Sequence, residues 1–161
     1  MALTRRKVKG RSSGQRICAI PHQVMDHPDY VNLSGSSLRL LWELAKQYNG
    51  YSNNGDLTAA WKVMHKRGFK SKATLTNALH ELLDKRFIVC TRQGQFMNPG
   101  KRCALYALSW QPINECIGKN LEVGPSQKPF RTFSAKIINL PGTENGATGN
   151  RNWGERGKNH G

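Results

Sequence analysis

Between positions 72 and 84, apolar and polar residues recur with the period of an α-helix. If the apolar residues face a core, a rotation of about 100° per residue turns a mostly polar set to the opposite side. This set comprises Lys72, Ala73, Thr76, Asn77 and His80. Asparagine can pair with adenine through two hydrogen bonds, threonine can touch a thymine methyl group, and lysine can reach guanine or phosphate. The pattern predicts a surface that reads base edges, with an ordinary solvated helix face as the alternative.

A second set of polar and basic residues flanks this stretch and suits contacts with a nucleic-acid backbone. It comprises Lys70, Ser71, Arg86, Arg92, Gln93, Gln95, Lys101 and Arg102. Lys70 and Ser71 would lie at the start of the helix, where free N–H groups and the helix dipole favour a phosphate. Ser71 is also a good N-cap, and the two roles are compatible. Arg86 would lie at the helix end, where a solvated side chain is the alternative.

The residue patterns do not predict an enzyme, a metal site or a cofactor. The chain has no Gly-rich phosphate loop followed by Lys-Ser or Lys-Thr, and no spacing that recommends a Ser-His-Asp or Cys-His arrangement. Its cysteines form no Cys-x-x-Cys pair, and its histidines do not supply zinc-finger spacing. We interpret the cysteines as small buried hydrophobic residues in a reducing compartment, and the few carboxylates as helix caps and surface charge.

The charge of the chain indicates a polyanionic partner. Its 161 residues include 25 Lys and Arg against 10 Asp and Glu, a net charge of +15. Nucleic acid is favoured over an anionic membrane surface as the partner. No apolar run approaches the roughly 20 residues of a membrane span, and no signal-peptide pattern follows the basic start. We therefore expect a cytoplasmic protein without membrane contact. Several cations belong to a basic arm: Arg5, Arg6, Lys7, Lys9, Arg11 and Arg16.

Capping and turn residues divide the central part of the chain into helices. Proline suits the first position of a helix, which predicts a short helix from Pro21 to Met25. A longer helix should begin at the serines of 34–37 and end at Asn49-Gly50. A further short helix ends at Gly68, and after a brief turn the helix of residues 72–84 follows. Two capped helices joined by a short Gly-containing turn make a helix-turn-helix.

A β-hairpin is predicted after the third main helix. Residues 87–91 and 103–110 have the composition of strands, and the segment between them is rich in turn residues and basic side chains. Trp42 and Trp61 fall inside helical patterns, so we expect them in the core rather than as base-stacking platforms. The fold class is therefore α+β and mainly helical. Three main helices followed by a hairpin wing is the order of a winged helix-turn-helix.

Composition divides the chain into three regions. Residues 1–16 are basic and nearly devoid of apolar side chains, so we expect a disordered arm that clamps a nucleic acid. Residues 17–111 should form the winged helix-turn-helix domain. Residues 112–161 have the Gly- and Asn-rich composition of a flexible tail.

Parts of the chain resemble winged helix-turn-helix proteins of phages, plasmids and other bacterial mobile elements, both regulator-like and replication-initiator-like. The resemblance spans residues 17–110 and is carried by Leu-Thr-Ala-Ala-Trp at 57–61, Ser-Lys-Ala-Thr-Leu-Thr-Asn-Ala-Leu-His-Glu-Leu-Leu at 71–83 and Phe-Ile-Val at 87–89. In the family's pattern, Gly usually ends the third helix, whereas Lys85-Arg86 stands here. A left-handed conformation would cost a non-glycine residue about 1 kcal/mol, which favours a different helix end.

These observations predict sequence-specific binding to double-stranded DNA through the helix of residues 72–84 and the wing. The resemblance implies a phage- or plasmid-type transcription regulator or a replication-associated factor. Two alternatives stay open: a protein-interaction module that inhibits a host nucleic-acid-binding complex, and an RNA-binding protein. A replication, transcription or other host protein complex as partner, and a homodimer, also stay open.

Overall fold

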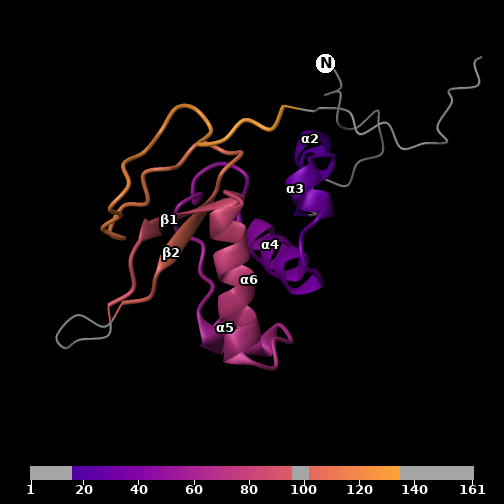
Figure 1. Ribbon diagram of the computed structural model, residues 1–161. Helices are drawn as coiled ribbons and strands as arrows, with labels where there is room; N and C mark the ends of the chain where they lie inside the picture. Colours follow the sequence, from indigo (N-terminus) through magenta and orange to yellow (C-terminus); the bar gives the residue numbers. More distant parts are fainter. Residues whose placement is uncertain (1–15, 96–101, 135–161) are drawn as a thin grey trace, which may run out of the picture.

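The computed structural model describes residues 16–95 and 102–134. This part of the chain has an α+β fold in which helices precede an antiparallel hairpin (Figure 1). The helices are α2 His22–Met25, α3 Pro28–Val31, α4 Gly35–Gln47, α5 Trp61–Lys66 and α6 Lys72–Asp84, and the strands are β1 Ile88–Arg92 and β2 Leu105–Leu108. The α+β class is confirmed, as is the order of the predicted helices and the hairpin, but α3 was not predicted. The arm residues 1–15, Lys101 and residues 135–161 lie outside the described residues.

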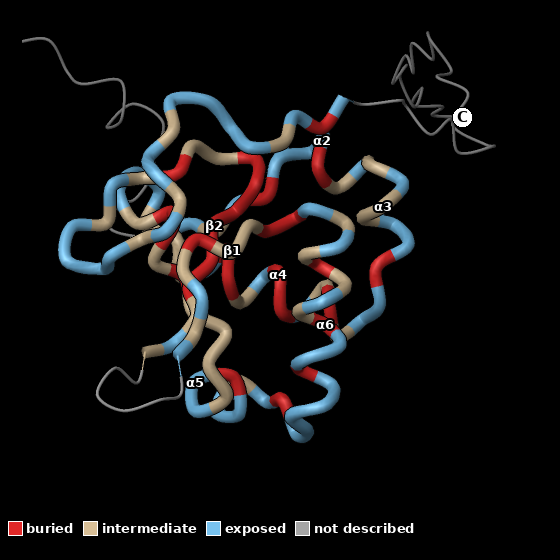
Figure 2. The backbone as a smooth tube through the Cα atoms, turned by 60° about the vertical axis from the view of Figure 1, so that its left-hand side comes forward, coloured by how far each residue is buried: buried red, intermediate tan, exposed pale blue. Residues whose placement is uncertain are grey.

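The core lies where α4 and α6 pack against each other and against the hairpin. Leucines 40, 41 and 44 of α4 are fully buried, as is Leu82 of α6. In Figure 1, α6 lies between the hairpin and α4, and Figure 2 shows buried stretches along all three. The α4 boundary matches the predicted cap, because the Ser34 hydroxyl accepts a hydrogen bond from the backbone N–H of Ser37. Helical periodicity therefore located both principal helices and their buried faces.

The hairpin is joined by a third short segment of the chain. In its antiparallel register, Ile88 lies opposite Leu108 and Cys90 lies opposite Tyr106. Leu57 forms an isolated bridge to Tyr106, with N···O distances of 3.1 and 2.8 Å. This bridge holds the connection between α4 and α5 to the outer side of β2. The start of α5 is thereby fixed next to the sheet.

The end of α6 differs from the sequence expectation. Arg86 adopts a left-handed conformation with φ of 55°, although glycine is the usual residue there. The Phe87 N–H donates to the Leu82 carbonyl at 2.9 Å, and the Arg86 N–H donates to the Leu83 carbonyl at 3.0 Å. This pair of bonds is the Schellman motif, which satisfies two carbonyls at the helix end. Because Phe87 is fully buried, its packing and these bonds offset the backbone cost of about 1 kcal/mol at Arg86.

The domain does not end at residue 111, which corrects the expected start of a flexible tail. Residues 112–134 return over the hairpin to the end of the molecule that holds α2 and α3 (Figure 1). Phe133 is buried, and its ring stacks on Phe87 with centroids 5.3 Å apart. Arg131 donates a 2.8 Å hydrogen bond to Asp29, and this bond lowers the pKa of the Asp29 carboxyl. A few contacts of aromatic and charged side chains therefore attach this segment to the rest of the fold, although its overall composition resembles that of a disordered segment.

Asn54 connects three parts of the fold from a fully buried position. Its side-chain amide donates to the carbonyls of Leu108, Gln111 and Pro112 at 3.0 to 3.1 Å, and its carbonyl accepts from the Leu108 N–H at 2.7 Å. The side chain therefore joins the loop before α5 to the end of β2 and to the chain that follows. In the described part of the chain, no helix is both long and apolar enough to cross a membrane.

Candidate nucleic-acid interface

The predicted reading face lies on the outer side of α6. Leu75, Ala78 and Leu82 are buried, whereas the five residues predicted to contact bases are all exposed. Those five are Lys72, Ala73, Thr76, Asn77 and His80. The helix therefore presents hydrogen-bonding groups along one outward face for most of its length.

The start of α6 is open to an anion. Ser71 occupies the predicted N-cap position, with φ of −132° and ψ of 136°. Among the described residues, however, its hydroxyl forms no capping hydrogen bond, and both Ser71 and Lys70 are exposed. The first backbone N–H groups of a helix carry a partial positive charge and have no partner within the helix. The cap, the free amides and Lys70 together suit a phosphate oxygen.

The turn between α5 and α6 is tightly determined. Gly68 has φ of 93°, a left-handed conformation that favours glycine, and the Arg39 guanidinium lies close to its Cα. Arg39 donates to the Arg67 carbonyl at 2.7 Å, and Arg67 in turn pairs with Glu43 at 2.6 Å. These contacts attach the turn to α4. The angle at which α6 leaves α5 is thus set by side chains of a third helix.

Glu81 clamps α6 onto the start of α4. Its carboxylate accepts hydrogen bonds from the hydroxyls of Ser34 and Ser37, both at 2.6 Å, and pairs with Lys85 at 3.2 Å. Partial burial alone would raise the pKa of Glu81, but the bonds from these three residues outweigh it and lower the pKa from 4.5 to about 2. The ionised Glu81 carboxylate therefore helps to hold α6 in its orientation against α4.

This clamp predicts a loss of stability in acid. Because the pKa of Glu81 is lowered in the folded state, its contribution is complete above pH 4.5 and is lost as the pH falls towards 2. We expect the contribution to be about 1 to 3 kcal/mol, since the side chain is about a quarter exposed. Urea unfolding between pH 7 and pH 2.5 should show a smaller acid loss for Glu81→Gln than for the wild type. The exposed-site control Glu115→Gln should follow the wild-type curve, and identical curves for all three proteins would contradict the clamp.

The hairpin residues divide into two groups. Gln93 and Gln95 are exposed, and backbone bonds of 2.9 and 3.0 Å pair Gln95 with Arg102. Arg92 instead donates to the Cys103 carbonyl at 2.8 Å and to the Lys119 carbonyl at 2.6 Å. Its guanidinium thus joins the hairpin to the following segment. The structure assigns Arg92 a role in the fold that sequence reasoning did not anticipate.

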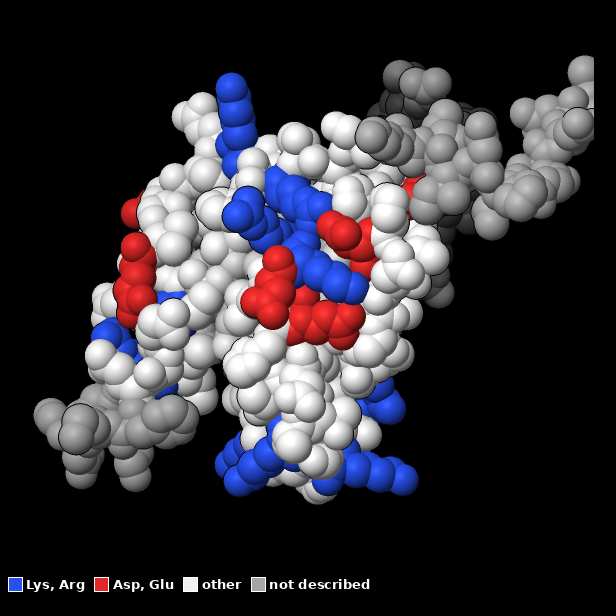
Figure 3. All heavy atoms as spheres, viewed as in Figure 1, with Lys and Arg blue, Asp and Glu red and all other residues white. Residues whose placement is uncertain are grey.

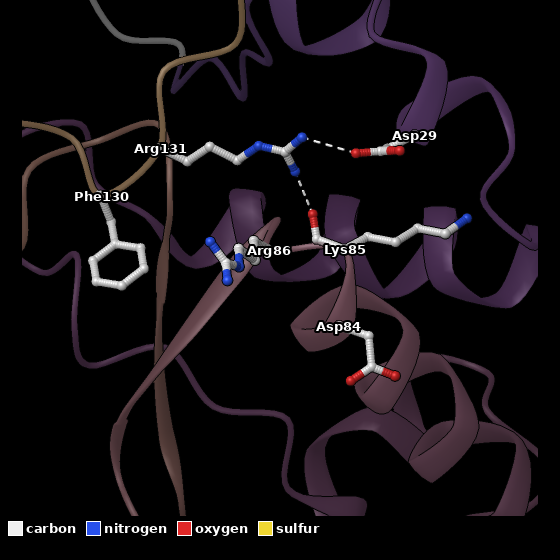
Figure 4. Close-up of a pocket in the computed structure, with 6 residues that line it drawn as sticks. All are labelled: Asp29, Asp84, Lys85, Arg86, Phe130 and Arg131. Atoms are coloured by element: carbon white, nitrogen blue, oxygen red, sulfur yellow. Dashed lines mark hydrogen bonds and ion pairs between the residues drawn. The ribbon is translucent and has the colours of Figure 1, made fainter.

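Arg86 lies at the opposite end of α6 from Lys72, about 20 Å away along the helix axis. It lines a separate cavity with Asp29, Asp84 and Arg131 (Figure 4). Lys85 also lines this cavity, so charges of both signs surround Arg86. The structure does not bring Arg86 together with the other predicted backbone contacts.

A groove of about 760 Å³ separates α6 from the hairpin and brings several predicted residues together. Lys72 and Thr76 line it from α6, and Gln93, Gln95 and Arg102 line it from the hairpin. No aspartate or glutamate is among the described residues that line the groove. Residues of α6 and the hairpin therefore line one groove, although they are separate in sequence.

Positive charge gathers where α5 and α6 meet. Residues 57–80 contain Lys62, Lys66, Arg67, Lys70 and Lys72 and no acidic residue. Figure 3 shows Lys and Arg at the lower end of the molecule, whereas acidic side chains lie nearer its middle. Lys62 and Lys66 were missed by sequence reasoning, although the long acid-free run around them was the available signal.

The tryptophans and cysteines are less buried than expected. Trp42 is 40% exposed, and Trp61 is half-buried on the wall of the groove. Cys18, Cys90 and Cys116 are half-buried, whereas Cys103 is exposed and lines the groove. Amphipathic helices place aromatic residues at their edges as well as in cores, so helical spacing alone did not distinguish the two positions.

Comparison of the chain with protein-family models, curated proteins and solved structures gives no match. What the chain binds is therefore inferred from the geometry and charge of this surface.

Proposed function

We propose that the chain is a winged helix-turn-helix protein that binds double-stranded DNA sequence-specifically. In this proposal α5 and α6 form the helix-turn-helix, and the β1–β2 hairpin is the wing. The order of elements supports this, as does the bridge from Leu57 to Tyr106, which adds a short third segment to the hairpin. A winged-helix domain presents its last helix to the major groove and its wing to the adjacent backbone or minor groove.

One observation carries the proposal: the exposed, hydrogen-bonding face of α6 and the polar side of the hairpin share an acid-free surface. Lys72 and Thr76 on the helix line the same groove as Gln95 and Arg102 on the hairpin. A duplex needs cations for its phosphates and neutral donors and acceptors for its base edges. This surface offers both, and the cations beside it belong to the α5–α6 junction.

The roles of individual residues follow from their positions. Asn77 and Thr76 lie at the centre of the exposed face and are assigned to base edges. Lys70 and the start of α6 are assigned to a phosphate. Gln95 and Arg102 are assigned to the backbone beside the wing. The resemblance to proteins of mobile elements suggests transcription regulation or a replication-associated role for this binding.

The proposal is tested by selection from a random duplex library, followed by titration of the enriched site. Asn77→Ala should weaken binding to that site by about 1 to 3 kcal/mol, because the lost base contact is one that distinguishes the selected site from other sequences. Its binding to a scrambled duplex should stay nearly unchanged, since phosphate contacts supply that affinity. Fluorescence anisotropy at fixed salt concentration measures both.

The matched control is Gln23→Ala, which truncates an exposed amide side chain on α2. It should leave both affinities unchanged. Equal losses on the specific and scrambled duplexes for Asn77→Ala would contradict the assignment of this residue. Enrichment of no motif would contradict sequence-specific binding and favour a protein-interaction module.

A further inference from the structure

The groove between α6 and the hairpin has an apolar floor that a duplex backbone does not require. Leu75, Leu79 and Tyr106 line it, together with Ala59 and Ala104. Sugars and phosphates crossing its mouth would leave this floor uncovered. An apolar, concave surface of this kind suits a flat hydrophobic group.

An aromatic wall faces the same space. Trp61 lines the groove, and its ring lies 4.9 Å from that of His65 at an interplanar angle of 33°. The His65 imidazole packs against the Trp61 indole ring and limits its movement. Every nucleobase has a π-face that stacks on such a ring, whatever its sequence.

The rim of the groove complements a nucleotide. Gln93 can hydrogen-bond to a base edge, and Lys72 supplies positive charge.

We propose that this groove holds an unpaired DNA base next to the duplex that α6 contacts. This inference rests on the proposed DNA-binding function. A base inside a duplex is stacked on both faces and paired along its edge, so it cannot reach Trp61 or the apolar floor. A base in a single-stranded extension or an opened pair can do so, at an unstacking cost that is lowest when it is already unpaired. The protein therefore binds a junction of duplex and single strand more tightly than a continuous duplex.

The test compares a blunt duplex carrying the selected site with the same duplex extended by a short oligothymidine overhang. Wild-type protein should bind the extended form about tenfold or more tightly, as expected for one stacked base. Trp61→Leu should lose this preference and keep its affinity for the blunt duplex, and Trp61→Phe should retain part of the preference. The control Trp42→Leu alters the half-exposed tryptophan of α4, which does not line the groove, and should keep the preference in full.

Cys103 provides a second measurement that needs no substitution. It is exposed and lines the groove, whereas the other three thiols are half-buried. Alkylation of Cys103, followed by mass spectrometry, should slow when the extended DNA is bound and should slow much less with the blunt duplex.

The outcomes separate this inference from the proposed function. Tight binding of the blunt duplex, with no gain from the overhang and no added protection of Cys103, would overturn the inference alone. It would favour an apolar protein segment as the occupant of the groove. Failure to bind any duplex would overturn the proposed function together with the inference.

Discussion

Replacing Asn54 with alanine is expected to lower the free energy of unfolding by about 3 to 5 kcal/mol. The change removes four hydrogen bonds and leaves the Leu108 N–H and the carbonyls of Gln111 and Pro112 without this partner, whereas the Leu108 carbonyl still accepts from the Gln111 N–H. Each buried polar group left unpaired costs about 1 to 3 kcal/mol. The substitution also leaves a void, because the side chain is fully buried. Urea unfolding followed by far-ultraviolet circular dichroism measures this loss.

Two further variants define the cause of the loss. Asn77→Ala makes the same chemical change at an exposed position and should alter stability by less than about 0.5 kcal/mol. Asn54→Asp keeps an acceptor for the Leu108 N–H but turns a carboxylate towards three carbonyls, so we expect it to be at least as destabilising as alanine. A small effect of Asn54→Ala, comparable with that of Asn77→Ala, would contradict the structural role of the buried amide.

The largest effect on DNA affinity is expected from removing the charge where α5 and α6 meet. The triple variant Lys66→Gln, Lys70→Gln, Lys72→Gln replaces three exposed cations near the α5–α6 turn. If each lysine neutralises one phosphate, the slope of log affinity against log salt falls by about 2.7. The same contacts predict a loss of about 10²- to 10³-fold in affinity at 0.1 M salt. Titrations at several salt concentrations measure both quantities.

A charge-matched control distinguishes local contacts from the effect of net charge. Lys46→Gln, Lys119→Gln and Lys128→Gln together remove the same charge from exposed lysines elsewhere on the molecule. This control should change the slope little, since distant charges are screened within about 10 Å at 0.1 M salt. If both triple variants lower the slope equally, the α5–α6 junction does not contact DNA. The lysines would then affect affinity only through the net charge of the molecule.

Local patterns predicted the elements of the fold because they depend on neighbouring residues. The spacing of leucines in α4 and α6 matches the helical period, and Ser34 begins α4 as a cap should. The exposed face of α6 followed from the same periodicity. Contacts between residues far apart in the chain could not be predicted in this way, because no local pattern marks the residues that form them. Arg131 is one basic residue among many, and nothing local marks it as the partner of Asp29.

The sequence by itself determined the three main helices, the hairpin, the positive charge and the residues that face outwards on α6, since each depends on composition or on a short periodic pattern. Only the tertiary structure decided which of those residues share a surface. It placed Gln95 and Arg102 on the same groove as Lys72. It placed Arg86 in a separate cavity that two aspartates also line. It placed the Arg92 guanidinium in a hydrogen bond with the Lys119 carbonyl. It also put Trp61 at the edge of the core, where it lines the groove. These outcomes depend on how the hairpin packs against α6, and that packing joins residues far apart in the chain, because Leu75 and Leu82 share a core with Tyr106 and Leu108.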